Sequence, residues 1–199
     1  MQYEVEQKFR VDDLAAIEAQ LIALGTRLGA AIEQLDRYFA HPCRDFVKTD
    51  EALRIRQVGQ QCYVTYKGPK IDPVTKTRRE IELPLSGGAE AATQWTLLWE
   101  ALGFKPVAEV RKRRLPAHIT WEDADIEIAL DQVDGVGTFV EFELTANADG
   151  LEQAKSRILS LAAALSLSHA ERRSYLELLL ESIQEAKQPR PLPQDRVSG

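Results

Sequence analysis

The stretch from Tyr3 to Arg10 reads YEVEQKFR, and its alternating side chains decide the fold. Successive side chains of an extended strand point to opposite faces. Glu4, Glu6 and Lys8 therefore share one face with Arg10, while mostly apolar residues occupy the other face. A single strand whose polar face meets water would show the same alternation. The interpretation of this stretch therefore depends on whether the pattern recurs along the chain.

The pattern does recur, in segments that differ mainly in the sign of their charges. We predict further strands at residues 32–39, 52–57, 63–67, 78–83, 107–115, 125–131 and 139–144. Arg54 and Arg56 share a face of one of these strands, and Glu141 and Glu143 share a face of the last. The basic run at 111–114 leaves two registers open, because a bulge would change which of its side chains point inward.

Apolar residues at helical spacing predict helices over 14–24, 89–102, 151–161 and 175–183. Asp12 and Asp13 are natural N-cap residues for the first of these helices. The second carries the apolar stripe Trp95, Leu98, Trp99 and Leu102. We expect the helices to cover the apolar faces of the strands.

Two architectures fit strands with one apolar face and one charged face. The first is an antiparallel sheet whose polar face meets water. The second is a closed or nearly closed β-barrel with a charged lumen and helices outside, in an α+β fold. Acids on the first and last strands with cations between them favour the barrel. Such a lumen suits a polyanion with bound cations, because Lys and Arg pair with phosphate and clustered carboxylates hold divalent metals.

The composition narrows the class of protein. At 199 residues and 44% hydrophobic content, with no apolar run that would span a bilayer, the chain is expected to be soluble, with no membrane partner. The polar N-terminus predicts a cytoplasmic protein without a secretory leader. Cys43 and Cys62 provide neither a metal-binding spacing nor a disulfide framework.

The net charge and the C-terminal composition set two further expectations. A net charge of −6 argues against nucleic acid as a partner, so any anion site must be local. Residues 1–183 are expected to form one domain, and the proline-containing segment 184–199 a disordered tail. The oligomeric state is left open between monomer and homodimer.

These strands carry a resemblance to a known family. The opening Glu-x-Glu-x-Lys at residues 4–8 resembles the motif that begins the CYTH family, the triphosphate tunnel metalloenzymes. The match continues in order through residues 53–56, 65–69, 78–82, 110–114, 130–131 and 141–143. Residues 174–179 resemble the helix that closes the family's fold, and residues 36–53 most resemble the class IV adenylate cyclase branch.

The resemblance implies an antiparallel eight-stranded barrel around a tunnel, with activity on a triphosphate and Mg²⁺ or Mn²⁺ as cofactor. It implies a catalytic role for Glu4, Glu6 and Lys8. The implied metal ligands are Glu4, Glu6, Asp131, Glu141 and Glu143, with Glu80 and Glu82 less clearly placed. The implied substrate-binding cations are Lys8, Arg54, Arg56, Lys67, Arg78, Lys112 and Arg114.

The resemblance leaves the reaction open. Members of the family cyclise ATP or hydrolyse thiamine triphosphate or inorganic triphosphate, so a nucleoside, thiamine or inorganic triphosphate is the expected partner. A class IV adenylate cyclase reaction is the first expectation, and a triphosphatase the alternative. A noncatalytic polyphosphate- or nucleotide-binding module is less well supported. A protein that only binds an anion, without metals, would not benefit from carboxylates placed beside the phosphates. Processing of RNA 5′-triphosphates is disfavoured by the acidic chain.

Overall fold

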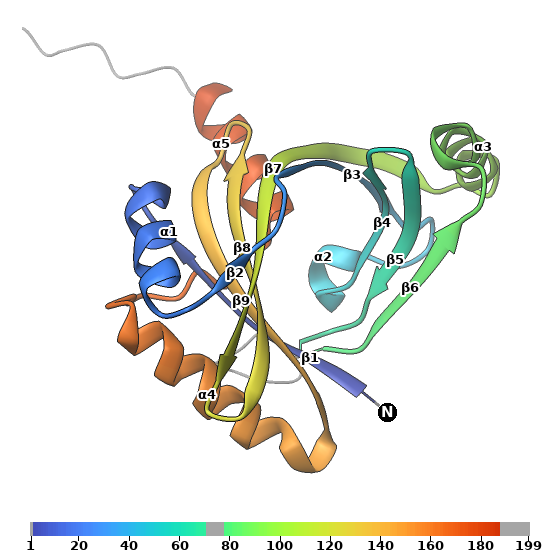
Figure 1. Cartoon of the computed structure of the whole chain (residues 1–199). Coiled ribbons are helices and arrows are strands. Elements are labelled where there is room, and N and C mark those ends of the chain that lie inside the picture. The colour runs from blue at the N-terminus through green and yellow to red at the C-terminus, as the bar shows by residue number, and fades with distance from the viewer. Residues whose placement is uncertain (1, 71–77, 188–199) are drawn as a thin grey trace, which may run out of the picture.

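A computed structural model describes residues 2–70 and 78–187, which form one curled antiparallel sheet with helices around it (Figure 1). The sheet follows the order β1 (Gln2–Arg10), β9 (Gly137–Asn147), β8 (Ala124–Val133), β7 (Lys105–Trp121), β3 (Ile32–Ala40), β4 (Ala52–Val58), β5 (Gln61–Lys67) and β6 (Glu80–Leu85). A short strand, β2 (Arg27–Leu28), pairs with β7 off this path.

The curl brings the two ends of the sheet together. An isolated bridge between Glu4 of β1 and Arg78 links the first strand to the chain just before β6. The expected eight-stranded antiparallel barrel is thus confirmed as a curled eight-stranded path, with β2 as an added ninth strand. In Figure 1 the sheet curls from β1 through β7 and β4 round to β6.

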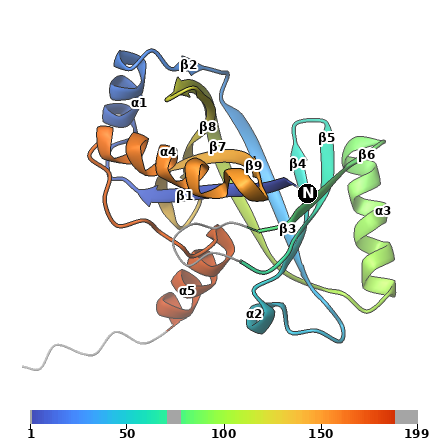
Figure 2. The same cartoon turned by 90° about the horizontal axis from the view of Figure 1, so that it is seen from below.

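Helices α1 (Leu14–Ala23) and α4 (Leu151–Ala164) cover the outer face of β1, β9 and β8. Figure 2 shows α4 lying along β1 and β9. Leu21 and Ile158 pack there against Val5 and Phe142, which point away from the lumen because they alternate with charged residues. The side chain of Asp13 caps α1, as its place in the sequence predicts, by accepting a hydrogen bond from the Ala16 amide.

Helix α3 (Gly88–Ala101) lies at the other side of the molecule, against β4 and β5 (Figure 1). Trp99 is buried there, against Phe39. Trp95, Leu98 and Leu102 are exposed by 39%, 48% and 61%. Of the four residues in the predicted apolar stripe, only Trp99 is therefore buried. The reason is that α3 meets the sheet along a narrow face centred on Ala92 and Trp99.

Helix α5 (Tyr175–Lys187) differs from the other helices in the face that it covers. Its buried residues Tyr175 and Leu178 pack against Val110, Val133 and Phe139. These three alternate with outward-facing residues in the same phase as Lys112, Asp131 and Glu141, so α5 closes one end of the barrel from the lumen side. The expectation that every helix lies outside the barrel was wrong for α5.

The element boundaries differ from the predictions in a few places. Strand β7 is longer than expected, and the short helix α2 (Phe46–Thr49) and the turn η1 (Ala148–Gly150) had not been predicted. Helix α5 continues to Lys187, past the expected domain end at residue 183, and the rest of the expected tail, 188–199, lies outside the described residues. Within the described ranges, no helix is both long and apolar enough to cross a membrane.

Candidate active site in the barrel lumen

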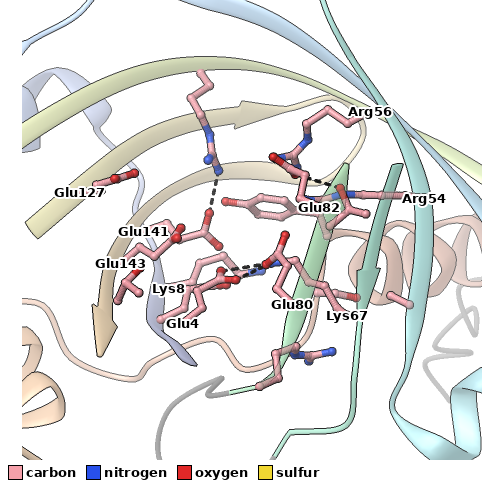
Figure 3. A pocket seen from close by; sticks show the side chains of 18 of the residues that line it. Glu4, Lys8, Arg54, Arg56, Lys67, Glu80, Glu82, Glu127, Glu141 and Glu143 are labelled. Carbon is pink, nitrogen blue, oxygen red and sulfur yellow. Dashed lines mark hydrogen bonds and ion pairs between the residues drawn. The ribbon is translucent and has the colours of Figure 1, made fainter. Parts of the chain in front are cut away.

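The lumen contains a cavity of about 490 Å³ whose lining is mostly charged (Figure 3). The predicted site residues that line it are Glu4, Glu6, Lys8, Arg54, Arg56, Lys67, Arg78, Lys112, Arg114, Glu141 and Glu143. In Figure 3, Arg54 and Arg56 lie on one side of the cavity, and Glu141 and Glu143 on the other. The residues predicted from strand alternation therefore line one cavity, although some of them, such as Glu4 and Glu143, lie 139 positions apart in the sequence.

One wall of the cavity is cationic and is organised by Asp36. The Asp36 carboxylate accepts hydrogen bonds from Arg54 at 3.2 Å and from Arg56 at 2.7 Å on each oxygen. It is 1% exposed. Burial opposes ionisation of Asp36, but the two guanidinium groups outweigh burial and hold its pKa well below the usual range. Asp36 thus keeps both arginine heads fixed at the edge of the lumen.

A second carboxylate, Asp131, organises the neighbouring cations. It accepts hydrogen bonds from Lys112 at 3.3 Å, from Arg114 at 2.8 Å and from the Tyr175 hydroxyl at 2.8 Å. Asp131 is fully buried and does not line the cavity itself. Its position favours a role in holding these cations over the metal-ligand role that the resemblance implies.

Lys112 is the cation whose protonation is most sensitive to its surroundings. It is 3% exposed. Burial and the nearby Arg114 lower the pKa of Lys112 to about 7, against the opposing effect of Asp131. Its side chain therefore exchanges a proton near neutral pH, whereas the arginines around it stay charged. An anionic ligand in the cavity would favour the charged form.

The opposite wall carries most of the acids, and it meets the neighbouring cations where Arg114 pairs with Glu141 at 2.7 Å. Lys67 forms ion pairs with Glu4 at 3.1 Å and with Glu80 at 2.7 Å. The strand register places Glu6 opposite Glu143, and Glu143 opposite Glu127. Like charges directly opposite in a sheet destabilise it. Burial, followed by the charges of Glu4, Glu6 and Glu141, raises the pKa of Glu143 to about 8.

This acidic wall fits a divalent cation by the chemistry of its donors. Mg²⁺ and Mn²⁺ take carboxylate oxygens, and a divalent ion would relieve the repulsion that raises the pKa of Glu143. Glu4, Glu6, Glu141 and Glu143 would hold it. No three acids in residues 2–70 and 78–187 form a ready-made cluster, so side chains such as Glu4 must turn from their present partners to bind an ion.

Two predicted substrate cations are anchored to the backbone. Arg78 donates to the carbonyls of Asp50 at 3.3 Å and Gly68 at 3.2 Å, so it also ties the chain before β6 to its neighbours. Lys8 donates to the carbonyl of Arg173 at 2.7 Å. Both side chains still line the cavity.

Sequence reasoning did not assign several lining or supporting residues to the site: Asp36, Tyr38, Thr65, Glu127 and Tyr175. Alternation along the predicted strand 32–39 puts Asp36 on one face with Gln34 and Tyr38, but its pairing with Arg56 follows from the register between β3 and β4. Strand alternation places Glu127 on the same face as Asp131, but the prediction did not include Glu127 in the site. Tyr175 carries no strand pattern, because it begins a helix.

Comparisons with known proteins agree with this fold. The family model for the CYTH domain matches residues 2–175. A Methanocaldococcus jannaschii protein named "putative adenylate cyclase" is 38% identical over 178 residues, which are 88% of this chain and 97% of that protein.

Solved structures show the same fold. The PH1819 protein of Pyrococcus horikoshii is 39% identical with a TM-score of 0.79, over 89% of this chain and 98% of that chain. A Hippeastrum protein, described as an adenylyl cyclase candidate with a dominant triphosphatase activity, is 18% identical with a TM-score of 0.64. The match covers 91% of this chain and 96% of the Hippeastrum chain, and at this identity it supports the fold alone.

Proposed function

Because the chain belongs to the CYTH domain family, we propose that it is a divalent-metal-dependent enzyme that acts on a triphosphate inside its barrel. The observation that carries the proposal is the gathering of cations and carboxylates around one cavity. Asp36 and Asp131 hold cations at its edge, and Glu4, Glu6, Glu141 and Glu143 line it. The two sets meet where Arg114 pairs with Glu141 at 2.7 Å and Lys67 pairs with Glu4 at 3.1 Å. A triphosphate with a divalent ion matches both walls at once.

The first candidate reaction is cyclisation of ATP. The ribose 3′-hydroxyl would attack the α-phosphorus, forming cyclic AMP and expelling pyrophosphate, while the hydroxyl proton passes to a base. Arg54, Arg56 and Arg114 would bind phosphate oxygens and stabilise the charge that develops on them. Bound Mg²⁺ or Mn²⁺ would neutralise further phosphate charge. The M. jannaschii relative, 38% identical, supports this choice through its name.

The second candidate is hydrolysis of a triphosphate, with water attacking the terminal phosphorus. The lining favours it, because most of its residues are charged or small and polar. Such groups recognise a phosphate chain, whereas a purine or a thiamine ring calls for apolar or aromatic contacts. Among the described lining residues, the aromatic ones are Tyr3, Tyr38 and Tyr175.

Product analysis separates the candidates. Purified protein is incubated separately with ATP, thiamine triphosphate and inorganic triphosphate, each with Mg²⁺, with Mn²⁺ and with a chelator. We expect metal-dependent turnover, with cyclic AMP plus pyrophosphate as the products of ATP. Orthophosphate without a cyclic product would identify a triphosphatase. Tight triphosphate binding with no turnover in any condition would indicate a binding module and overturn the proposal.

The cationic wall makes a prediction about affinity. Replacing Arg54 by Ala is expected to weaken binding of inorganic triphosphate by about 10- to 100-fold, because a charged hydrogen bond to phosphate contributes about 1.5–3 kcal/mol. Titration calorimetry measures this change. Arg113→Ala is the matched control, because Arg113 is exposed on the outer face of β7. Equal affinities of the wild type and Arg54→Ala would remove Arg54 from the binding site.

A further inference from the structure

The chain approaches helix α5 along the open edge of β1, beside the lumen. Ala170 forms an isolated bridge with Phe9, and the Glu171 amide donates to the Lys8 carbonyl at 2.7 Å. Helix α5 then begins with a capping box, in which the Ser174 hydroxyl accepts from the Glu177 amide and the Glu177 carboxylate accepts from the Ser174 amide. The backbone at Tyr175, the first residue of α5, is therefore fixed by the pairing with β1 before it and by the capping box around it.

Tyr175 contacts the phosphate-binding cations in two ways. Its hydroxyl donates to Asp131 Oδ2 at 2.8 Å, and Asp131 in turn binds Lys112 and Arg114. Its ring lies 3.9 Å from Lys8 Nζ and 4.9 Å from Lys112 Nζ, distances at which a cation is attracted to an aromatic face. The Tyr175 side chain, which is 7% exposed, thus contacts Lys8, Lys112 and Asp131, and Asp131 in turn holds Arg114.

Packing alone does not account for the hydroxyl. The surroundings of the ring include Val110, Val133 and Phe139, which a phenylalanine would satisfy equally well. The hydroxyl instead completes the hydrogen bonds of Asp131, a carboxylate with no exposed surface. Without that donor, Asp131 Oδ2 keeps only Lys112 and Arg114 as partners, and these two cations would shift with the oxygen that they share.

We propose that Tyr175 is a positioning residue for the reaction, which aligns Lys112 and Arg114 through Asp131 and holds Lys8 through its ring. The inference rests on the proposed function, because it assigns these cations to the substrate's phosphates. Catalysis of phosphoryl chemistry depends on cations that are already in place when charge develops. Helix α5 is then part of the active site as well as a cover for one end of the barrel.

The test compares Tyr175→Phe with Tyr175→Leu. Tyr175→Phe keeps the ring and loses the hydrogen bond, so kcat is expected to fall about 10-fold while KM changes less than about threefold. Tyr175→Leu also loses both ring contacts, so triphosphate affinity is expected to weaken about 10-fold in addition. A purely structural role predicts a lower melting temperature with kcat and KM of the folded fraction unchanged, and that result would overturn the proposal.

Tyr63→Phe is the matched control, because the Tyr63 hydroxyl bonds to Gln61 outside the cavity lining. A double-mutant cycle with Asp131→Asn gives the sharper decision. Since Tyr175 acts through Asp131, Tyr175→Phe should cost little further kcat in that background, and fully additive losses would overturn the proposal. If Asp131→Asn does not fold, Arg114→Lys replaces it, because it keeps the charge but loses the two-point contact with Asp131.

The outcomes for this inference and for the proposed function can be told apart. If the wild type binds a triphosphate but does not turn it over, the proposed reaction is wrong. The double-mutant cycle of Tyr175→Phe and Asp131→Asn is then measured with triphosphate affinity in place of kcat. Coupling between Tyr175 and Asp131 in that affinity supports the positioning role, and additivity overturns it. If the wild type neither binds nor turns over ATP, thiamine triphosphate or inorganic triphosphate, both proposals fall.

Discussion

Replacing Glu6 by Gln is expected to lower metal-dependent turnover by at least about a hundredfold and to leave the fold intact. Glu6 is 8% exposed, lines the cavity and lies opposite Glu143 across the β1–β9 pair. Gln has nearly the same shape but no charge, and its amide is a far weaker ligand for Mg²⁺ or Mn²⁺. The loss should therefore come from the metal site and not from packing.

Two measurements isolate that cause. Calorimetric titration with Mn²⁺ should show weaker binding to Glu6→Gln, and higher Mn²⁺ should recover part of the lost rate. Glu109→Gln is the control, because Glu109 is exposed and pairs with Arg37. It should behave like the wild type in both measurements. If Glu6→Gln retains full turnover and unchanged Mn²⁺ affinity, the metal is not held by Glu6.

The barrel and its charged lumen follow from strand alternation, a property of single strands. Once Arg54 is known to alternate with Leu53 and Ile55, its face is determined, and burial of Ile55 against α3 shows which face turns inward. Alternation left the register of the basic run 111–114 open, and the structure decides it. Lys112 and Arg114 line the lumen, while Arg111 and Arg113 are exposed.

Properties that depend on how elements meet were out of reach of the sequence. The pairing of Asp36 with Arg56 requires the register of β3 on β4, which no local pattern encodes. The apolar face of α5 was visible in the sequence, but a helical stripe does not say which face of a sheet it will cover. Tyr175 was therefore assigned to packing outside the barrel instead of to the lumen.

The last prediction concerns Glu143, where stability and activity should change in opposite directions. Without metal, Glu143→Gln is expected to unfold at a higher temperature than the wild type above pH 8, by about 2–6 °C, while losing metal-dependent turnover. The reason is that burial and the neighbouring Glu4, Glu6 and Glu141 raise the pKa of Glu143 to about 8. Its ionised form is disfavoured in the folded barrel, and Gln avoids that cost.

The sign of the pH dependence follows from proton linkage. Between the ordinary glutamate pKa and about 8, folded Glu143 holds a proton that the unfolded chain has released, so stability falls as pH rises through this range. Above pH 8 both states are ionised and the cost is constant. The advantage of Glu143→Gln in a chelator should therefore grow from pH 5 to about 8 and then level off.

Metal should reverse this order. Mn²⁺ would replace the proton on Glu143 and stabilise the folded wild type by mass action, increasingly as pH rises, whereas Glu143→Gln would gain much less. Melting temperatures from pH 5 to 9, measured with chelator and with Mn²⁺, test the order of stabilities without metal and its reversal with metal. The control Glu109→Gln should melt like the wild type in every condition. A Glu143→Gln protein that melts below the wild type in chelator at pH 9 would contradict the assigned repulsion. A wild type that melts below Glu143→Gln without metal and above it with Mn²⁺ would mean that Glu143 is kept for the ion, at a cost to the stability of the empty barrel.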